Sequence, residues 1–212
     1  MTSILYSIDP ITRLARQANL SNWEDLLTYV QHLPYGRTSN PTDLSLVITE
    51  QKGTCSSKHA LLKKLADENK IKGVELILGM YLMNEANTPG IYPVLTNSGL
   101  SAIPEAHCYL QINGLRMDLT NPQSNIDKLR GDILEEISIQ PEQVGAFKRS
   151  YHKNYLRKYK KEKQLTQSFE QLWQIRENCI KALSTNRLPT LRRLMQQIPK
   201  HCDPSKALPP YF

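Results

Sequence analysis

The sequence predicts an α+β protein built around a helix that begins at a cysteine. Three observations favour this class: an apolar-faced helical pattern from Cys55, a hairpin signal around Asn113-Gly114, and two amphipathic helical patterns after residue 140. The helix from Cys55 is expected to pack on an antiparallel sheet that contains the hairpin. We therefore predict one domain over residues 1–140 and a basic α-helical extension over residues 141–212.

Two short helices are expected before residue 34. Asp9 followed by Pro10 is typical of an N-cap and first helical position, so a helix is predicted over residues 9–20. The stretch Ser21-Asn22-Trp23-Glu24 has the capping-box pattern and opens a second helix. We expect residues 1–33 to pack on the rest of the domain.

Cys55 lies where a thiol can work as a thiolate. Gly53 interrupts the chain just before it, and the inward-facing Ala60, Leu61 and Leu65 indicate a helix that starts at the cysteine. Free backbone N–H groups and the positive end of the helix dipole favour the anion there. Such placement lowers a cysteine pKa from ~8.5 to ~3.5–7.5.

A strand, a long loop and a hairpin follow. Residues 74–81 are predicted to form a mostly buried strand, and the Asn-, Pro- and Gly-rich residues 84–104 a loop that shapes a cleft. Asn113-Gly114 joins two further strands and sets Leu110 opposite Met117. In this register His107 and Asp118 share a face as diagonal neighbours, ~7–8 Å apart at the backbone, which is within reach of a hydrogen bond.

Cys55, His107 and Asp118 together make a nucleophile, a base and an orienting acid. Cys108 points to the opposite face of its strand and cannot join them. His59, one turn after Cys55, could share a zinc site with it, but a zinc site needs more ligands than the neighbouring sequence supplies. No metal and no cofactor are therefore expected.

The basic charge is concentrated after residue 140. Residues 141–212 hold 15 Lys and Arg against 5 acids, whereas the first 140 residues hold 12 against 15. A Tyr-interleaved basic stretch over residues 148–163 is compatible with an acidic partner, with nucleic acid or an acidic membrane surface, or with a solvated helix face. Trp23 and Trp173 lie on apolar faces and are expected in the core.

Composition also restricts the class of protein. The four cysteines have no paired spacing, which indicates reduced thiols rather than a disulfide framework. No signal-peptide pattern and no apolar run of membrane-spanning length is present. The cytoplasm is the expected location.

Three blocks of the sequence resemble the core of the transglutaminase-like superfamily. They are Gly53-Thr54-Cys55-Ser56-Ser57-Lys58-His59-Ala60-Leu61-Leu62, Ala106-His107-Cys108-Tyr109-Leu110 and Met117-Asp118-Leu119-Thr120. The resemblance covers about residues 34–122 and implies a papain-like core, with the cysteine on a central helix against an antiparallel sheet. It implies Cys55 as nucleophile, His107 as general base and acid, and Asp118 as the orienting carboxylate. The length fits a small prokaryotic-type member rather than the larger animal crosslinking enzymes.

The predicted function is hydrolysis of an amide or peptide bond through a thioester acyl-enzyme. The substrate would be a peptide, a protein or a small amide. The backbone N–H of Cys55 would stabilise the oxyanion, with the side-chain amide of Gln51 as the second donor. Two alternatives stay open: a transamidase that transfers the acyl group from protein glutamine to an amine, and a non-catalytic interaction protein that uses the basic helices.

Overall fold

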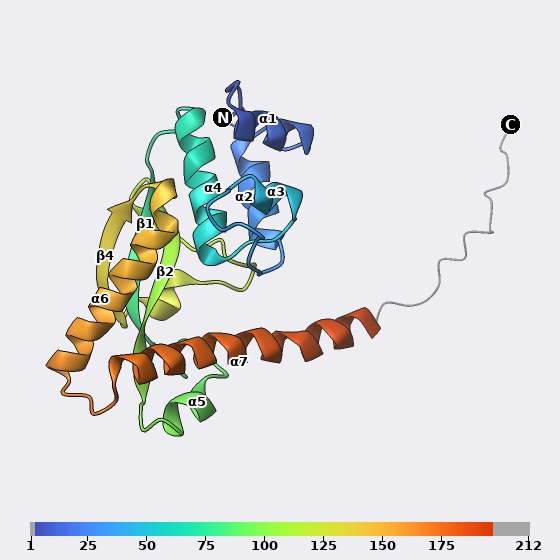
Figure 1. Ribbon diagram of the computed structural model, residues 1–212. Coiled ribbons are helices and arrows are strands. Elements are labelled where there is room, and N and C mark those ends of the chain that lie inside the picture. Colours follow the sequence, from blue (N-terminus) through green and yellow to red (C-terminus); the bar gives the residue numbers. More distant parts are fainter. Residues whose placement is uncertain (1–2, 197–212) are drawn as a thin grey trace, which may run out of the picture.

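The computed structural model describes residues 3–196, with side chains described as far as residue 183 (Figure 1). The α-helices are α1 (Pro10–Gln17), α2 (Trp23–His32), α3 (Leu46–Thr49), α4 (Cys55–Glu68), α5 (Tyr92–Thr96), α6 (Ala146–Glu162) and α7 (Phe169–Gln196). The strands are β1 (Val74–Asn84), β2 (Ala102–Ile112), β3 (Leu115–Met117) and β4 (Ile133–Ile139), and the 3₁₀ helices are η1 (Ile126–Leu129) and η2 (Pro141–Val144). The predicted α+β class is confirmed.

The four strands form one antiparallel sheet in the order β3-β2-β1-β4. The long pair of β1 and β2 runs from Val74 opposite Ile112 to Asn84 opposite Ala102. Strand β3 pairs only with the last three residues of β2. Within this sheet, β2 is therefore an unpaired edge along the segment that carries His107.

The predicted hairpin register is confirmed. Leu110 pairs with Met117, and Ile112 with Leu115. Asn113 and Gly114 have φ angles of 48° and 82°, the left-handed conformation that a two-residue hairpin turn requires at both central positions. Strand β3 ends one residue before Asp118, which leaves the aspartate free of the ladder but still on the hairpin.

The loop predicted over residues 84–104 is confirmed only in part, because the short helix α5 interrupts it and β2 begins before its end. The carboxylate of Glu85 accepts hydrogen bonds from the backbone N–H groups of Gly90, Ile91 and Tyr92 at 2.7–3.1 Å. These bonds fold the segment into a compact turn that leads directly into α5. Strand β2 also begins at Ala102, earlier than the sequence pattern indicated.

Two helix starts differ from their predictions. The N-cap of α2 is Asn22, whose side chain accepts from the N–H of Asp25 at 2.9 Å, so Ser21 does not cap the helix. The 3₁₀ helix η2 begins at Pro141, and Gly145 separates it from α6.

Strand β4, which the sequence pattern did not indicate, pairs with β1 on the side away from β2.

The core has one hydrophobic cluster on each face of the sheet. Leu76 and Leu78 of β1 belong to the cluster that joins α2 and α4 to the sheet. Ile77 between them belongs to the second cluster, which includes residues of α5 and α7. Neighbouring strand residues point to opposite faces, so both faces are covered by helices. None of the helices within residues 3–196 is long and apolar enough to cross a membrane.

Candidate functional site

Cys55 is the first residue of α4, as the sequence predicts. Thr54 is the N-cap: its hydroxyl accepts from the N–H of Ser57, and the Ser57 hydroxyl accepts from the N–H of Thr54 at 2.9 Å. These reciprocal bonds fix the start of the helix and hence the position of the thiol. The cysteine is buried, with 8% of its surface exposed.

Lys58 ties the start of α4 to two loops. Its side chain is fully buried, and Nζ donates to the carbonyl oxygens of Leu33 at 2.6 Å and Thr120 at 2.7 Å. A Cβ on Gly53 would lie 2.7 Å from Cγ of Lys58. The glycine before the cysteine therefore makes room for the lysine that anchors the loop after Asp118.

Replacing Lys58 with methionine is expected to lower the free energy of unfolding by about 2–4 kcal/mol. The variant leaves two buried carbonyl groups without a hydrogen-bond donor, and each unsatisfied group lowers the free energy of unfolding by ~1–3 kcal/mol. Removal of the buried lysine charge offsets part of this loss. Urea denaturation measures the change. Lys63→Met is the matched control, because Lys63 makes only an i,i+4 pair with Asp67, worth ~0.3–0.5 kcal/mol. Equal destabilisation by both variants would contradict the anchoring role.

The structure brings His107 and Asp118 together as predicted. Nε2 of His107 lies 2.9 Å from Oδ2 of Asp118, and the other carboxylate oxygen accepts from the N–H of Thr120 at 2.9 Å. With Nε2 held by the carboxylate, Nδ1 is the nitrogen left for the thiol. Gly79 of β1 pairs with His107 of β2. A Cβ at Gly79 would lie 2.9 Å from the Tyr109 ring, which packs beside the imidazole, so the glycine leaves room for that ring.

The charges of this group favour a thiolate next to an imidazolium. Burial raises the pKa of the Cys55 thiol, but the positive charges of Lys148 and His107, with hydrogen bonds from His107 and the Cys108 N–H, lower it to about 6. Burial lowers the pKa of His107, but Asp118 and Cys55 together raise it well above its ordinary value. Asp118 is buried, yet His107 holds the pKa of its carboxyl far below the usual range.

His59, which the sequence analysis weighed as a zinc ligand, is a positioning residue. It is fully buried; its Nδ1 lies 2.7 Å from the carbonyl of Cys55, and its Nε2 accepts from the N–H of Leu119 at 2.8 Å. Burial lowers the pKa of His59 to about 4, so the ring is neutral and bridges the cysteine to the residue after Asp118. Both ring nitrogens are thereby occupied. No group of three or more His, Cys, Asp or Glu residues in the described part of the chain is arranged to hold a metal ion.

Lys148 is the residue that the sequence analysis missed. It reaches from the first turn of α6, with Nζ 2.6 Å from the Ser56 hydroxyl and 3.9 Å from the Cys55 sulfur. Burial lowers the pKa of Lys148, but the nearby negative charges of Cys55 and Glu105 raise it above its ordinary value, so the lysine stays a cation. Lys148 is 93 positions away from Cys55 in the chain, too far for spacing or periodicity to indicate the contact.

Gln51 does not lie with this group. Its side chain is exposed, and it lines a separate hollow with Tyr29, His32 and Pro34. The left-handed backbone of Gln51, with φ of 50°, turns the chain at this point before it reaches the helix. The oxyanion role predicted for Gln51 therefore has no support in its placement.

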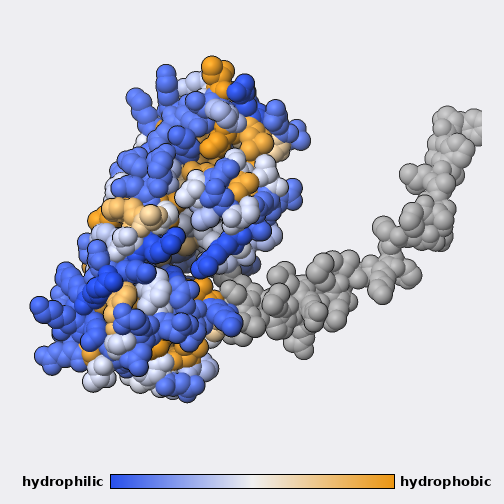
Figure 2. Space-filling model, viewed as in Figure 1, coloured by the Kyte–Doolittle hydropathy of each residue, from blue (hydrophilic) through white to orange (hydrophobic). Residues whose placement is uncertain are grey.

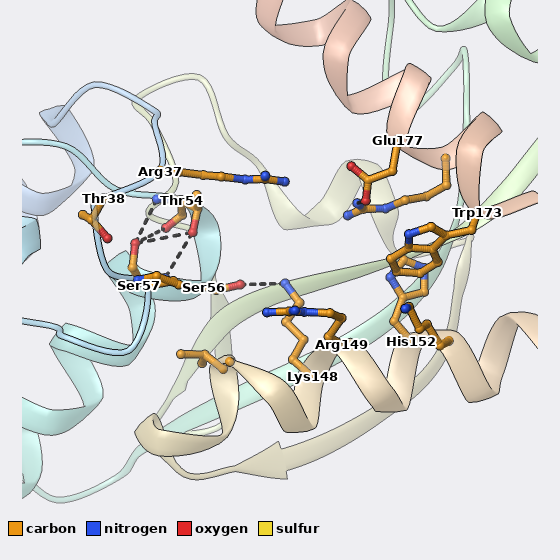
Figure 3. Close-up of a pocket in the computed structure, with 15 residues that line it drawn as sticks. Arg37, Thr38, Thr54, Ser56, Ser57, Lys148, Arg149, His152, Trp173 and Glu177 are labelled. Atoms are coloured by element: carbon orange, nitrogen blue, oxygen red, sulfur yellow. Dashed lines mark hydrogen bonds and ion pairs between the residues drawn. The ribbon is translucent and has the colours of Figure 1, made fainter. Parts of the chain in front are cut away.

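A cavity of about 530 Å³ adjoins the thiol (Figure 3). Ser56 and Lys148, each with a side-chain atom 3.9 Å from the cysteine sulfur, form part of its wall. The other lining residues come from the loop before α3, from the start of α4, from the end of η2 and the first turns of α6, and from α7. They are Arg37, Thr38, Pro41, Thr54, Ser57, Val144, Gly145, Arg149, His152, Lys153, Trp173, Arg176 and Glu177. Trp173, predicted in the core, packs partly buried against the second hydrophobic cluster and also lines this cavity. The segment 84–104, predicted to shape the cleft, contributes no lining residue to it.

The chain was compared with protein-family models, with curated proteins and with solved structures, and none of them matches it.

Proposed function

We propose that this chain is a cysteine-dependent acyl-transfer enzyme that hydrolyses an amide or peptide bond. The observation that carries the proposal is the group formed by Cys55, His107 and Asp118. A thiol with a pKa of about 6 begins a helix, and its histidine partner is held by a carboxylate at 2.9 Å. Nucleophilic acyl transfer requires a nucleophile hydrogen-bonded to a base, and an acid that is hydrogen-bonded to the base and orients it.

In the proposed reaction the Cys55 thiolate attacks the carbonyl carbon, and the carbonyl π electrons move to oxygen. The Ser57 N–H is taken by the Thr54 hydroxyl, so the backbone N–H groups of Cys55 and Ser56, which have no acceptor within the helix, would donate to that oxyanion. Collapse of the tetrahedral intermediate breaks the C–N bond, and His107 gives its proton to the leaving amine. Water then attacks the thioester while His107 takes its proton, and the C–S bond breaks to release the acid and the thiolate.

The arrangement also supports a transglutaminase-like, papain-like core for residues 34–122. The cysteine begins a helix that packs on an antiparallel sheet, the histidine lies on a strand of that sheet, and the aspartate follows the hairpin. A cysteine nucleophile must stay reduced, and Cys55, Cys108 and Cys179 are all free thiols among the described residues. A reducing compartment such as the cytoplasm fits this requirement.

Trapping of the acyl-enzyme tests the reaction. The protein is mixed with 4-nitrophenyl acetate, quenched in acid and examined by intact and peptide mass spectrometry. We expect a burst of 4-nitrophenolate and an acetyl group on Cys55 that hydroxylamine removes. Addition of glycinamide during turnover separates the two reactions, since a transamidase would form acetylglycinamide and a hydrolase acetate. Absence of both the burst and the acetyl group would contradict the proposal.

The rate of alkylation by iodoacetamide is expected to rise through a midpoint near pH 6 at Cys55. The thiol pKa is lowered to about 6, so the reactive thiolate is present above this pH and lost below it. Burial raises the pKa of Cys179 to about 11 and also raises that of Cys108, so both should react slowly. Cys202 lies outside the described residues.

His107→Ala supplies the control for this pH profile. The variant removes a cation and a hydrogen bond that lower the thiol pKa, so the midpoint should move upward. Peptide mapping of the alkylated protein reads each cysteine separately. A midpoint at Cys55 that matches the ordinary thiol value in the unaltered protein would contradict activation of this cysteine.

A further inference from the structure

The cavity beside Cys55 carries more positive charge than its own residues neutralise. Arg176 is compensated, because its guanidinium bonds to both carboxylate oxygens of Glu105 and to Glu177. Glu177 is the acidic residue of the lining, and this contact engages it. The remaining lining cations are Arg37, Lys148, Arg149 and Lys153.

Two of these cations have no partner among the described residues. The guanidinium groups of Arg37 and Arg149 form no ion pair or side-chain hydrogen bond within residues 3–183. Figure 3 shows Arg149 beside Lys148 on α6, while Arg37 extends across the cavity from the opposite wall. Lys153 lies 5.1 Å from the centre of the Trp173 ring and makes no ion pair with the acidic side chains described up to residue 183. Positive groups therefore face one hollow from two sides.

This arrangement differs from a continuous basic track. Farther along α6 the cations make contacts within the protein: Arg157 lies 4.1 Å from the centre of the Phe169 ring, and Lys160 donates to the carbonyl of Leu165. Lys158 pairs with Glu162 on the same helix. Figure 2 shows hydrophilic side chains over most of the face around α6. The guanidinium groups of Arg37 and Arg149 line the cavity, whereas the cations farther along α6 do not.

From this charge distribution we infer that the cavity binds a carboxylate or phosphate group on the peptide or amide whose carbonyl reaches Cys55. The inference rests on the proposed function, since it names the substrate class of the same site. A volume of about 530 Å³ lies within the ~300–1,000 Å³ of small-molecule pockets, which is enough for a few residues of a peptide. Guanidinium groups suit both anions because their paired N–H groups match two oxygens at once. The cavity thus selects acidic substrates by charge before the thiol acts.

Alkylation of Cys55 by a charged and an uncharged reagent tests the electrostatic part. The rate constants for iodoacetate and iodoacetamide are measured on the full chain. Both reagents react with the same thiolate, so the ratio of the two rate constants does not depend on how much thiolate each variant contains. In Arg37→Gln/Arg149→Gln the iodoacetate-to-iodoacetamide ratio should fall about fivefold at low salt, and the difference should shrink at 1 M salt, where the Debye length is ~3 Å. Arg13→Gln/Arg16→Gln removes the same charge from exposed positions on α1 and should leave the ratio unchanged. An unchanged ratio in the cavity variant would overturn the inference.

Peptide binding tests the substrate class without any reaction. Cys55→Ala protein is titrated with short peptides that differ only in one glutamate, phosphoserine or glutamine, and the fluorescence of Trp173 reports occupancy. We expect at least one anionic peptide to bind about fivefold or more tightly than the glutamine peptide, and to lose this advantage in the Arg37/Arg149 variant. Tighter binding of the glutamate peptide would identify a carboxylate as the preferred group of the substrate, and tighter binding of the phosphoserine peptide would identify a phosphate. Equal binding of all three peptides, or tighter binding of a deoxythymidine oligonucleotide, would overturn the inference.

These readouts separate the two proposals. Selective binding of anionic peptides with an unreactive Cys55 would support the cavity inference and contradict the acyl-transfer chemistry. Acetylation of Cys55 with no charge preference would support the chemistry and overturn the cavity inference.

Discussion

Cys55→Ala is expected to reduce acyl transfer from 4-nitrophenyl acetate to the uncatalysed background. Removal of the nucleophile from a nucleophile–base pair costs up to about 10⁵–10⁶-fold in turnover, because no other group can form the acyl-enzyme. Cys108 lies near the thiol in the fold, but burial raises its pKa and keeps it protonated. Steady-state release of 4-nitrophenolate, corrected for the reaction without protein, measures the loss.

Two controls make this result specific. Cys179→Ala changes a buried cysteine of the second hydrophobic cluster and should leave turnover unchanged. Thermal unfolding of Cys55→Ala should stay close to that of the unaltered protein, since the reciprocal bonds of Thr54 and Ser57 that fix the start of α4 do not involve the thiol. Substantial turnover by the folded Cys55→Ala protein would exclude the proposed nucleophile.

Asp118→Asn is expected to lower kcat/KM by about 10²–10⁴-fold, because the amide no longer orients the imidazole or stabilises its charge. The pH profile should also narrow. In the unaltered protein, activity should rise as Cys55 ionises near pH 6 and fall when His107, whose pKa is raised by Asp118, loses its proton. Loss of the carboxylate lowers the pKa of His107, so the alkaline limb of the profile moves to lower pH. A neutral imidazole no longer stabilises the thiolate, so the pKa of Cys55 rises and the acid limb moves to higher pH.

Asp127→Asn is the matched control for this substitution. Asp127 is exposed and pairs with Arg130 one turn away, so kcat/KM and both limbs of the pH profile should be unaffected. A wide, unshifted profile in Asp118→Asn would show that the aspartate supports the fold rather than the histidine.

The site residues that could be predicted from the sequence are those whose geometry is local. The Asn113-Gly114 turn determines the hairpin register, and the register places His107 within reach of Asp118. The position of Cys55 follows from its own capping residues, which are contiguous with it. Contacts set by the tertiary packing of distant elements could not be inferred, and Lys148 is the main example.

Other features were hidden for identifiable reasons. Strand β4 contains Glu135 and Glu136, whose charges weaken the apolar alternation of a strand that forms a sheet edge. Glu85 organises the turn before α5 through backbone N–H groups, a contact that composition alone does not indicate. The sequence analysis treated the basic residues 148–163 as one surface. In the structure their side chains have different surroundings, because Arg149 lines the cavity whereas Arg157 lies over the Phe169 ring.

The contact between Lys148 and Cys55 has a consequence for the newly made chain. The ribosome must add 93 residues after Cys55 before the lysine exists, which takes roughly 5–20 s at ~5–20 residues per second. During that interval the nascent thiol lacks one of the cations that lower its pKa. The full set of cations that lowers the Cys55 pKa is therefore assembled only after α6 has been made and has docked on the rest of the chain.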